Sequence, residues 1–469
     1  MESEAQPIVH HSHSRKAGVL LHITSLPNQQ GSGCLDENAW RFVDWMAQAG
    51  LKSWQTLPLN HPNYDGSPYN SVSAFAMNPA FLPATWQTDL DAKAFAQFLQ
   101  SEPHWLQDYA LFMAIRHAYQ GQPWSQWPSD LKFREPNALA EFAQQHHNEI
   151  THLKQQQFSL LNYWHQLRDY ANHKGIELYG DMPIFVAYDS ADVWAHPEQF
   201  ILDEQLNPPV VAGVPPDYFS ETGQRWGNPH YDWARMQADG FEWWMQRLDA
   251  ALELFDVVRI DHFRGLQASW QINASEETAI NGHWLEVPGE ALLKKLLEKH
   301  PDMPIIAEDL GLITPEVIAL KNEFDLPGMS VLQFGFNGLP DNPHSLDEQV
   351  INSVTYTGTH DNDTTLGWFN ELDSDTANRV SQSLQERIGG TLNALELPTQ
   401  MPWPLIVAGA LSVAERFVMP MQDLLALDSA HRMNIPGVAE GNWGWQFNWS
   451  QVPANLASDI HSLLTHAQR

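Results

Sequence analysis

The stretch DVVRIDH (256–262) combines a short apolar run with charged residues at its carboxyl end. PIIAEDL (304–310) and SVTYTGTHDND (353–363) have the same form. A short run of apolar and β-branched residues without alternation is typical of a strand buried on both faces, as in a parallel sheet. We therefore predict that the charged residues after each run lie at the carboxyl ends of parallel strands.

Five more strand-like runs share this pattern, and helical patterns separate most of the eight. One such helix, TPEVIALKNEF (314–324), begins with a threonine cap and a proline at its first position. Strand–helix alternation indicates a parallel sheet, and eight such units predict a (β/α)₈ barrel of the TIM type with its catalytic residues at the carboxyl ends of the strands. The alternative is an open doubly wound sheet, which favours a glycine-rich phosphate loop after the first strand, and the sequence has none. The five further runs are GVLLH (18–22), SWQTLPL (53–59), IELYGDMPI (176–184), MSVLQF (329–334) and RFVMPMQDLL (416–425).

The domain organisation follows from the segments that do not fit a plain barrel. We expect residues 1–15 to form a flexible polar tail and residues 16–469 to form a single catalytic barrel. Residues of about 84–170 are polar and helical in pattern, which predicts a helical insertion after the second strand. Residues of about 188–250 contain a long segment rich in proline, glycine and aromatic residues, which predicts an active-site loop insertion.

Composition limits the classes of partner and the compartment. The net charge of −32 repels phosphate backbones and anionic lipids, so we expect no nucleic acid and no membrane as partners, whereas a neutral sugar fits. The 20 tryptophans raise the carbohydrate hypothesis, because flat aromatic faces are platforms for sugars, although most will fill the core. There is no apolar leader and only one cysteine, Cys34, which predicts a reducing, cytoplasmic location.

Three carboxylates follow strand-like runs and are the candidate catalytic groups: Asp261, Glu308 and Asp361. Cleavage of a glycosidic bond with retention needs two carboxyl groups about 5–5.5 Å apart, one a nucleophile and the other an acid/base. Arg259 lies on the same side of its strand as Asp261, so we expect it to lower the pKa of that carboxyl. The apolar residues before Glu308 and the charge after it predict a raised pKa.

Two other classes of protein remain open from these residues alone. A metal-dependent barrel hydrolase would need neutral imidazoles converging on one point, but the first strand ends in His22 followed by ITSLP rather than in an HxH pattern. The candidate ligands for such a site are His22, Asp181, Asp261, His262, Glu308, His360 and Asp361. A catalytically inactive sugar-binding barrel would be favoured if a carboxylate were missing, and all three are present.

Longer motifs are more specific than these single residues. From about residue 16 to about residue 447, the chain resembles the amylomaltases, the 4-α-glucanotransferases or disproportionating enzymes of the α-amylase clan. These enzymes have no separate C-terminal β-sandwich domain. The resemblance is carried by GVLLHITSLP, WQTLPL, SPYNSVSAFAMNP, GDMPIFVAYDSADVWAHP, VAGVPPDYFSETGQRWGNPHYDW, VVRIDHFRG, IIAEDLG, TGTHDND and RMNIPG with GNW.

The resemblance implies a reaction as well as a fold. Segments of α-1,4-glucan would be moved between maltooligosaccharides, or to glucose, by retaining double displacement through a covalent glycosyl-enzyme, with no cofactor and no metal. Asp261 would be the nucleophile, Glu308 the acid/base and Asp361 the transition-state stabiliser. Other matching positions imply contacts with substrate: Arg259, His262 and His360 around the attached sugar, Tyr69 and Asp181 as further contacts, Gln224, Trp226 and Asn228 on an arching loop, and Asn434.

The arching loop, residues 210–233, is predicted to act as a mobile cover in which Tyr218, Phe219 and Trp226 are the candidate stacking surfaces. The chain also departs from the family's pattern at a few positions, none of them among the three carboxylates. These departures are Met77 in place of glycine, GCLD at 33–36 in place of an acidic GDLG-like stretch, Ser269 in place of tyrosine and Gln446 in place of arginine.

Overall fold

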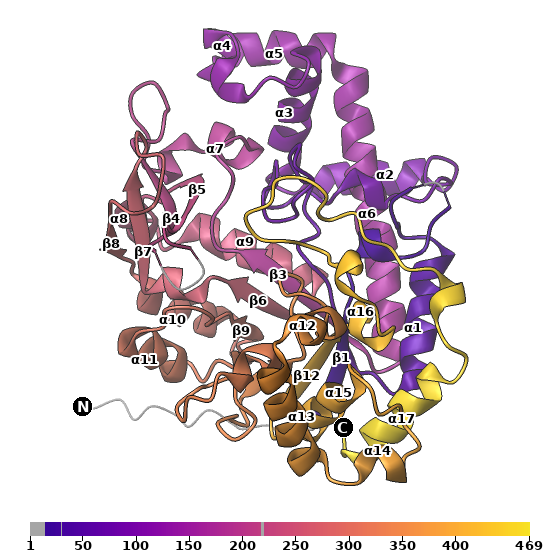
Figure 1. The fold of residues 1–469 in the computed structure, drawn as a ribbon. Coiled ribbons are helices and arrows are strands. Elements are labelled where there is room, and N and C mark those ends of the chain that lie inside the picture. Colours follow the sequence, from indigo (N-terminus) through magenta and orange to yellow (C-terminus); the bar gives the residue numbers. More distant parts are fainter. Residues whose placement is uncertain (1–14, 30, 217–219) are drawn as a thin grey trace, which may run out of the picture.

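The computed structural model describes residues 15–29, 31–216 and 220–469 (Figure 1). All of the predicted tail except Arg15, and two of the three predicted stacking residues, Tyr218 and Phe219, lie outside these described residues.

Eight parallel strands form a nearly closed barrel in the order β10-β11-β12-β1-β2-β3-β6-β9. The amide of Ala307 in β9 donates to the carbonyl of Pro327, just before β10, at 2.8 Å, and so joins the two ends of this order. Each strand overlaps one of the eight predicted runs, and the predicted (β/α)₈ class is confirmed. The strands are β1 (Lys16–Leu20), β2 (Ser53–Gln55), β3 (Glu177–Pro183), β6 (Val257–Asp261), β9 (Ile305–Ala307), β10 (Gly328–Val331), β11 (Ser353–Tyr356) and β12 (Arg416–Pro420).

Helices surround the barrel and bury the outward-facing strand residues (Figure 1). The barrel interior holds a separate apolar cluster that includes Leu20, Val257, Ile306 and Val418. The interior is therefore a packed core rather than a hollow channel. The helices outside the two insertions are α1 (Glu37–Ala49), α9 (Glu242–Leu254), α10 (Gly289–Lys299), α11 (Pro315–Glu323), α12 (Thr365–Glu371), α13 (Ser374–Ile388), α14 (Thr391–Ala394), α15 (Trp403–Leu411), α16 (Met421–Leu424) and α17 (Leu456–His466).

Between β2 and β3 the chain forms five α-helices, of which α3, α4 and α5 lie above the barrel in Figure 1 and α6 runs down beside it. The longest of them, α6, carries Gln157, whose buried side chain accepts from the amide of Met77 and donates to its carbonyl, both at 2.8 Å. This pair of bonds ties the segment after β2 to the helices. The five are α2 (Ala92–Phe98), α3 (Leu106–Ala118), α4 (Ser129–Lys132), α5 (Pro136–Gln145) and α6 (His147–His173).

A second, antiparallel sheet in the order β5-β4-β7-β8 lies beside the barrel, on the left of Figure 1. Its strands come from two separate parts of the chain: β4 (Val210–Val214) and β5 (Gln224–Pro229) precede β6, whereas β7 (Ala268–Asn273) and β8 (Gly282–Glu286) follow it. These four strands were not predicted from the sequence. The short helices α7 (Ala191–Ala195) and α8 (Trp233–Ala238) flank the first pair.

Residues 421–469, all of them described, form helices and turns and no strand. Within the described part of the chain, no helix combines the length and the apolar character needed to cross a membrane.

The departures from the family's pattern are accommodated in the structure. Met77 is buried beneath α6, and the buried Ser269 hydroxyl lies 3.3 Å from Nδ1 of His230. Gln446 donates to the carbonyls of Leu26 and Gly31, which ties the C-terminal segment to the loop after β1. In the stretch 33–36, Asp36 caps α1 by accepting from the amide of Asn38.

Candidate active site

The carboxyl ends of the barrel strands open into one large cleft of about 1220 Å³. Of the predicted site residues, Asp181 alone does not line this cleft, because it is buried behind Arg259. The predicted residues that line it are Tyr69, Gln224, Trp226, Asn228, Arg259, Asp261, His262, Glu308, His360, Asp361 and Asn434.

Arg259 is the central cation of the site. In the β3–β6 register it pairs with Asp181, and Pro183 pairs with Asp261. Its guanidinium donates to both carboxylate oxygens of Asp181, at 3.0 and 2.7 Å, and to Oδ1 of Asp261 at 2.9 Å. The side chains of Arg259 and Asp181 are 5% and 1% exposed, so this ion pair is a rigid element at the cleft floor.

Tyr69 joins two sides of the cleft floor. Its hydroxyl donates to Oδ2 of Asp181 at 2.6 Å, and its ring stacks on His360 with centroids 5.1 Å apart and an interplanar angle of 11°. Burial, together with the charge of Asp181, raises the pKa of the Tyr69 phenol well above its ordinary value. Tyr69 is therefore a neutral hydrogen-bond donor that holds the loop after β11 against β3.

Asp261 combines an ion pair with strong desolvation. Burial raises the pKa of this carboxyl well above its ordinary value, and the charges of Asp181, Glu308 and Asp361 act in the same direction, whereas Arg259 opposes them. The predicted contact with Arg259 is confirmed, and Arg259 lowers the pKa of Asp261 as expected, but the net shift of that pKa is upward. The reason is that desolvation by the barrel mouth and three neighbouring carboxylates outweigh one shared guanidinium.

Glu308, which follows β9, is held by backbone amides. Its Oε2 accepts from the amide of His262 at 2.6 Å, and its Oε1 accepts from the amide of Leu310 at 3.0 Å. Burial raises its pKa to about 7, against the opposing effects of Arg259 and the two amides, with Asp309 adding to the rise. This agrees with the predicted rise in the pKa of Glu308, and burial is the larger of the two causes that raise it.

His262 contributes its backbone as well as its ring. It takes a left-handed conformation with φ of 53°, which points its amide at Glu308. Burial lowers the pKa of the ring to about 3, so the imidazole is neutral. Its Nε2 is buried and has no hydrogen-bond partner among the described residues.

Asp361 and His360 lie on the loop that follows β11. The side-chain amide of Asn434 donates to Oδ1 of Asp361 at 2.7 Å, and Nε2 of His360 lies 3.4 Å from the same oxygen. The Asp361 side chain is 49% exposed, and the guanidinium of Arg432 donates to its backbone carbonyl at 3.0 Å. Asn434 and Arg432 thus fix the carboxylate from the opposite side of the mouth, and Asp361 faces the open cleft.

The strand β5 forms the wall opposite this loop. Trp226 meets the His262 ring edge to face, with centroids 4.8 Å apart, and its indole donates to the side-chain oxygen of Gln224 at 3.1 Å. Asn228 donates to the carbonyl of Val186 at 2.8 Å, so its amide anchors the strand as well as lining the cleft. The indole of Trp226 is 38% exposed, which leaves a flat surface for a ligand.

Sequence reasoning missed several residues that line the cleft. Trp443 lies 5.9 Å from Tyr69 and 6.0 Å from His360, ring centroid to centroid, and has a positive φ of 66°. Its stretch, GNW, was among the matching motifs, so the signal was present but was not assigned to this tryptophan. Other aromatic or cationic lining residues not singled out are Tyr64, Phe185, Tyr188, Arg264, Trp284, Phe334, Trp368 and Arg432.

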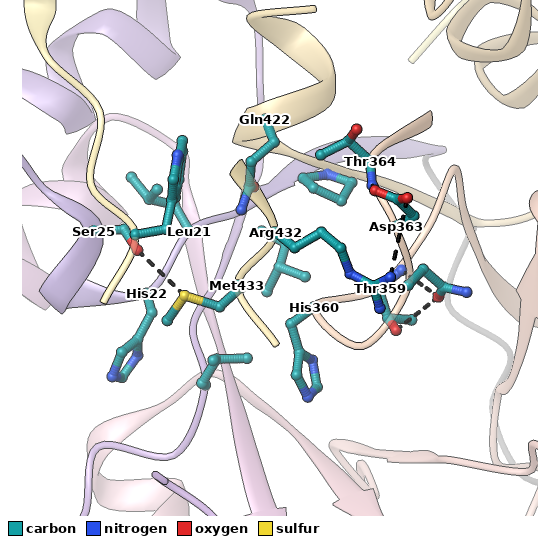
Figure 2. A pocket seen from close by; sticks show the side chains of 15 residues that line it. Leu21, His22, Ser25, Thr359, His360, Asp363, Thr364, Gln422, Arg432 and Met433 are labelled. Atoms are coloured by element: carbon teal, nitrogen blue, oxygen red, sulfur yellow. Dashed lines mark hydrogen bonds and ion pairs between the residues drawn. The ribbon is translucent and has the colours of Figure 1, made fainter. Parts of the chain in front are cut away.

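A much smaller cavity of about 20 Å³ lies beside the cleft and shares His360 with it. Figure 2 shows its side chains coming from the ends of β1, β11 and β12 and from residues 432–433, with the hydroxyl of Ser25 bonded to the sulfur of Met433. Its volume is that of a buried water site rather than of a sugar.

The metal-hydrolase alternative was tested against the placement of possible ligands. Among residues 15–29, 31–216 and 220–469, no three or more His, Cys, Asp or Glu side chains are grouped so that they could hold a metal ion.

A (β/α)₈ barrel with three carboxylates, an arginine and neutral histidines in one open cleft defines a barrel enzyme that processes glycosidic bonds. The family model described as 4-alpha-glucanotransferase matches residues 21–90 and 83–451. The chain is 44% identical to a 4-alpha-glucanotransferase of Thermus thermophilus, over 95% of this chain and 96% of that protein. It is 42% identical to a 4-alpha-glucanotransferase of Synechocystis, over 93% of this chain and 95% of that protein.

A solved structure agrees with these sequences. The amylomaltase from Streptococcus agalactiae, in complex with acarbose, is 31% identical and superposes with a TM-score of 0.90, over 97% of this chain and 99% of that one. The chain belongs to the 4-alpha-glucanotransferase family. It is a transferase of the amylomaltase type, and neither the metal-dependent hydrolase nor the inactive sugar-binding barrel is favoured.

Proposed function

We propose that this enzyme moves α-1,4-glucan segments between maltooligosaccharides, or to glucose, by double displacement with retention of configuration. The observation that carries the proposal is the contrast between two carboxyl groups in one cleft. Asp261 accepts a charged hydrogen bond from Arg259, whereas Glu308 accepts from backbone amides. When two coupled carboxyl groups hold one proton between them, the group beside the cation is the one that is ionised.

In the first step, Glu308 gives its proton to the glycosidic oxygen as the bond from that oxygen to the anomeric carbon breaks. An oxygen of Asp261 then bonds to the anomeric carbon, and the shortened glucan leaves with a free hydroxyl. The raised pKa of Glu308 supports this role, because a group with a pKa of about 7 is protonated in a large share of molecules near neutral pH.

In the second step, the ionised Glu308 takes the proton from the 4-hydroxyl of an incoming sugar, whose oxygen displaces Asp261 from the anomeric carbon. Asp261 is released as the carboxylate and Glu308 is again protonated, so protons and charge balance over the cycle. The neutral imidazole of His262 is proposed to bind a sugar hydroxyl through its unpartnered Nε2.

Asp361 and His360 are proposed to stabilise the positive charge that develops on the sugar ring in both steps. The carboxylate of Asp361 is exposed to the cleft and is oriented by Asn434, so it is free to accept from sugar hydroxyls. Tyr69 stacks on His360 and is proposed to contact the sugar. Asp181 is proposed to act on the sugar indirectly, through Arg259.

Gln224, Trp226 and Asn228 are proposed to bind the glucan from the wall formed by β5. Segment 210–233 is proposed to exclude water from the glycosyl-enzyme while an acceptor enters. The acarbose bound to the Streptococcus agalactiae amylomaltase supports a carbohydrate ligand for this cleft. A cytoplasmic location is proposed from the single cysteine and is tested by fractionating cells of the source organism.

The product pattern from pure maltotriose tests the proposal. A ladder of maltooligosaccharides plus glucose is expected for a transferase. Glucose and maltose alone would mean hydrolysis, and no change would mean a sugar-binding protein. Asp261→Asn, prepared in the same way, is the control for host enzymes: it should keep its fold and give no ladder, because covalent catalysis fails without the nucleophile. Turnover like that of the wild type in this variant would refute the assignment of Asp261.

A further inference from the structure

Asp423 is a buried carboxylate that the proposed mechanism does not use. It lies in α16, directly after β12, and is 1% exposed. Its Oδ2 accepts from the hydroxyls of Thr357 and Thr365, at 2.6 and 2.7 Å, and its Oδ1 accepts from the amide of Thr365 at 2.7 Å. Among the described residues, no lysine, arginine or histidine forms an ion pair with it.

The two threonines bracket the loop that carries His360 and Asp361. Thr357 is the first residue after β11, and Thr365 is the first residue of α12. Both are fully buried, at 0% exposure. One carboxylate therefore ties the start of this loop to its end, and the loop projects from that fixed base towards the cleft.

Two further hydrogen bonds hold the rest of the loop, both of them at Asp363. Ser429 donates to the carboxylate of Asp363 at 2.7 Å, and Gln333 donates to the carbonyl of Asp363 at 2.9 Å. Gln422, the neighbour of Asp423, lines the small cavity together with His360 (Figure 2). A shift of the loop at the Asp423 base would move His360 against Tyr69, on which its ring stacks.

Keeping a carboxylate here is costly. A buried charge without a cation must be stabilised by its hydrogen bonds alone, and bonds to an ionised acceptor are shorter and stronger than neutral ones. The three short bonds at Asp423 fit this condition, although burial still raises its pKa above the ordinary value. An interior site that needed only packing would be satisfied by an apolar residue at lower cost.

We propose that Asp423 is a positioning residue for the transfer reaction, which fixes His360 and Asp361 by clamping both ends of their loop. It does not touch substrate. The inference rests on the proposed roles of His360 and Asp361, since the clamp has a catalytic effect only if these residues act on the sugar.

The test is Asp423→Asn in the full-length enzyme. The amide keeps an acceptor for the Thr365 amide but places an NH₂ against two hydroxyl donors. For maltotriose, kcat per active site, with sites counted by acarbose titration, is expected to fall about 10- to 100-fold, since small misplacements of catalytic groups cost about 100-fold. KM should change little. An unchanged kcat would overturn the proposal.

Asp256→Asn, at the opposite end of the barrel, is the control for general destabilisation. Asp256 accepts from the amide of Leu178 at 2.7 Å and from Arg168 at 2.8 Å, at the start of β6. This variant should lower the melting temperature but leave kcat per site unchanged. If it lowers kcat as much as Asp423→Asn does, the effect of Asp423 is general destabilisation and the proposal falls.

A double variant tests the route of action. In a His360→Ala background, Asp423→Asn should cost clearly less than in the wild type, because both changes disturb the same loop. An equal penalty in the two backgrounds would contradict positioning through this loop. If Asp423→Asn does not fold, Thr357→Val and Thr357→Ser replace it: loss of the hydroxyl should lower kcat and the serine should retain it, whereas equal rates would overturn the clamp.

The failure of this inference is distinguishable from failure of the proposed function. Asp361→Asn is measured in the same assay. If that variant turns over like the wild type, the proposed role of Asp361 is wrong. If it is inactive while Asp423→Asn is fully active, the inference about Asp423 alone is wrong.

Discussion

The replacement Glu308→Gln is the sharpest perturbation of the proposed mechanism. Both carboxylate oxygens of Glu308 accept hydrogen bonds from backbone amides, one from His262 and one from Leu310. The glutamine NH₂ must therefore face one of these donors, and an unsatisfied buried donor costs about 1–3 kcal/mol of stability. We expect a folded variant with a lower melting temperature, so rates must be normalised to the number of competent sites.

The loss of rate depends on the leaving group. General acid catalysis contributes about 10²- to 10⁴-fold, and the variant should lose this factor with maltotriose, whose leaving oxygen needs a proton. An α-glucosyl fluoride departs with little protonation, so the glycosyl-enzyme should still form on Asp261. It should then break down slowly, because the acceptor hydroxyl has lost its base, and mass spectrometry of the intact protein should detect the added sugar.

The pH dependence of the transfer rate tests the role of Glu308 as an acid. Glu308 must be protonated in the first step, so the wild-type rate with maltotriose should fall as the pH rises through about 7. At pH 8, roughly a tenth of the molecules would retain the proton, by the definition of a pKa. The glutamine in the Glu308→Gln variant cannot titrate. The rate of adduct formation from the fluoride should therefore not fall as the pH rises through about 7.

Rescue of the Glu308→Gln variant by azide tests whether the reaction is a double displacement. This anion needs no deprotonation, so it should speed breakdown of the adduct and give a product of retained α configuration. A β-configured azide product would refute double displacement. Failure to form an adduct, together with no rescue by azide, would mean that Glu308 is not the acid/base.

Three further outcomes are expected. Asp309→Asn removes a negative charge that raises the pKa of Glu308 and leaves Lys321, 2.6 Å from that carboxylate, unpaired, so the alkaline limb of kcat/KM should move to lower pH; an upward move would contradict the electrostatic account. Trp226→Ala should raise hydrolysis of maltotriose relative to transfer, because water gains access to the glycosyl-enzyme; a fixed ratio with only a lower melting temperature would make this tryptophan a packing residue. Exhaustive chelation should leave the rate unchanged, and a loss that one divalent metal restores would favour a metal-dependent mechanism.

The local sequence determined the barrel and the positions of the three carboxylates. A strand buried on both faces has a recognisable apolar run, and parallel topology brings the ends of distant strands to one mouth. Asp261, Glu308 and Asp361 could therefore be assigned to one site before any distance was known. The resemblance in long motifs such as VVRIDHFRG added the reaction type, because such motifs record a whole local environment.

Tertiary structure alone decided the rest. The pairing of β4 with β7 joins segments on either side of β6, and no local periodicity encodes a partner at that separation. The burial of Asp181 behind Arg259 depends on the β3–β6 register. The net rise in the pKa of Asp261 depends on how much water the assembled barrel mouth excludes. Sequence specifies which groups are present and where each strand ends, whereas desolvation and long-range pairing exist only after the chain has folded.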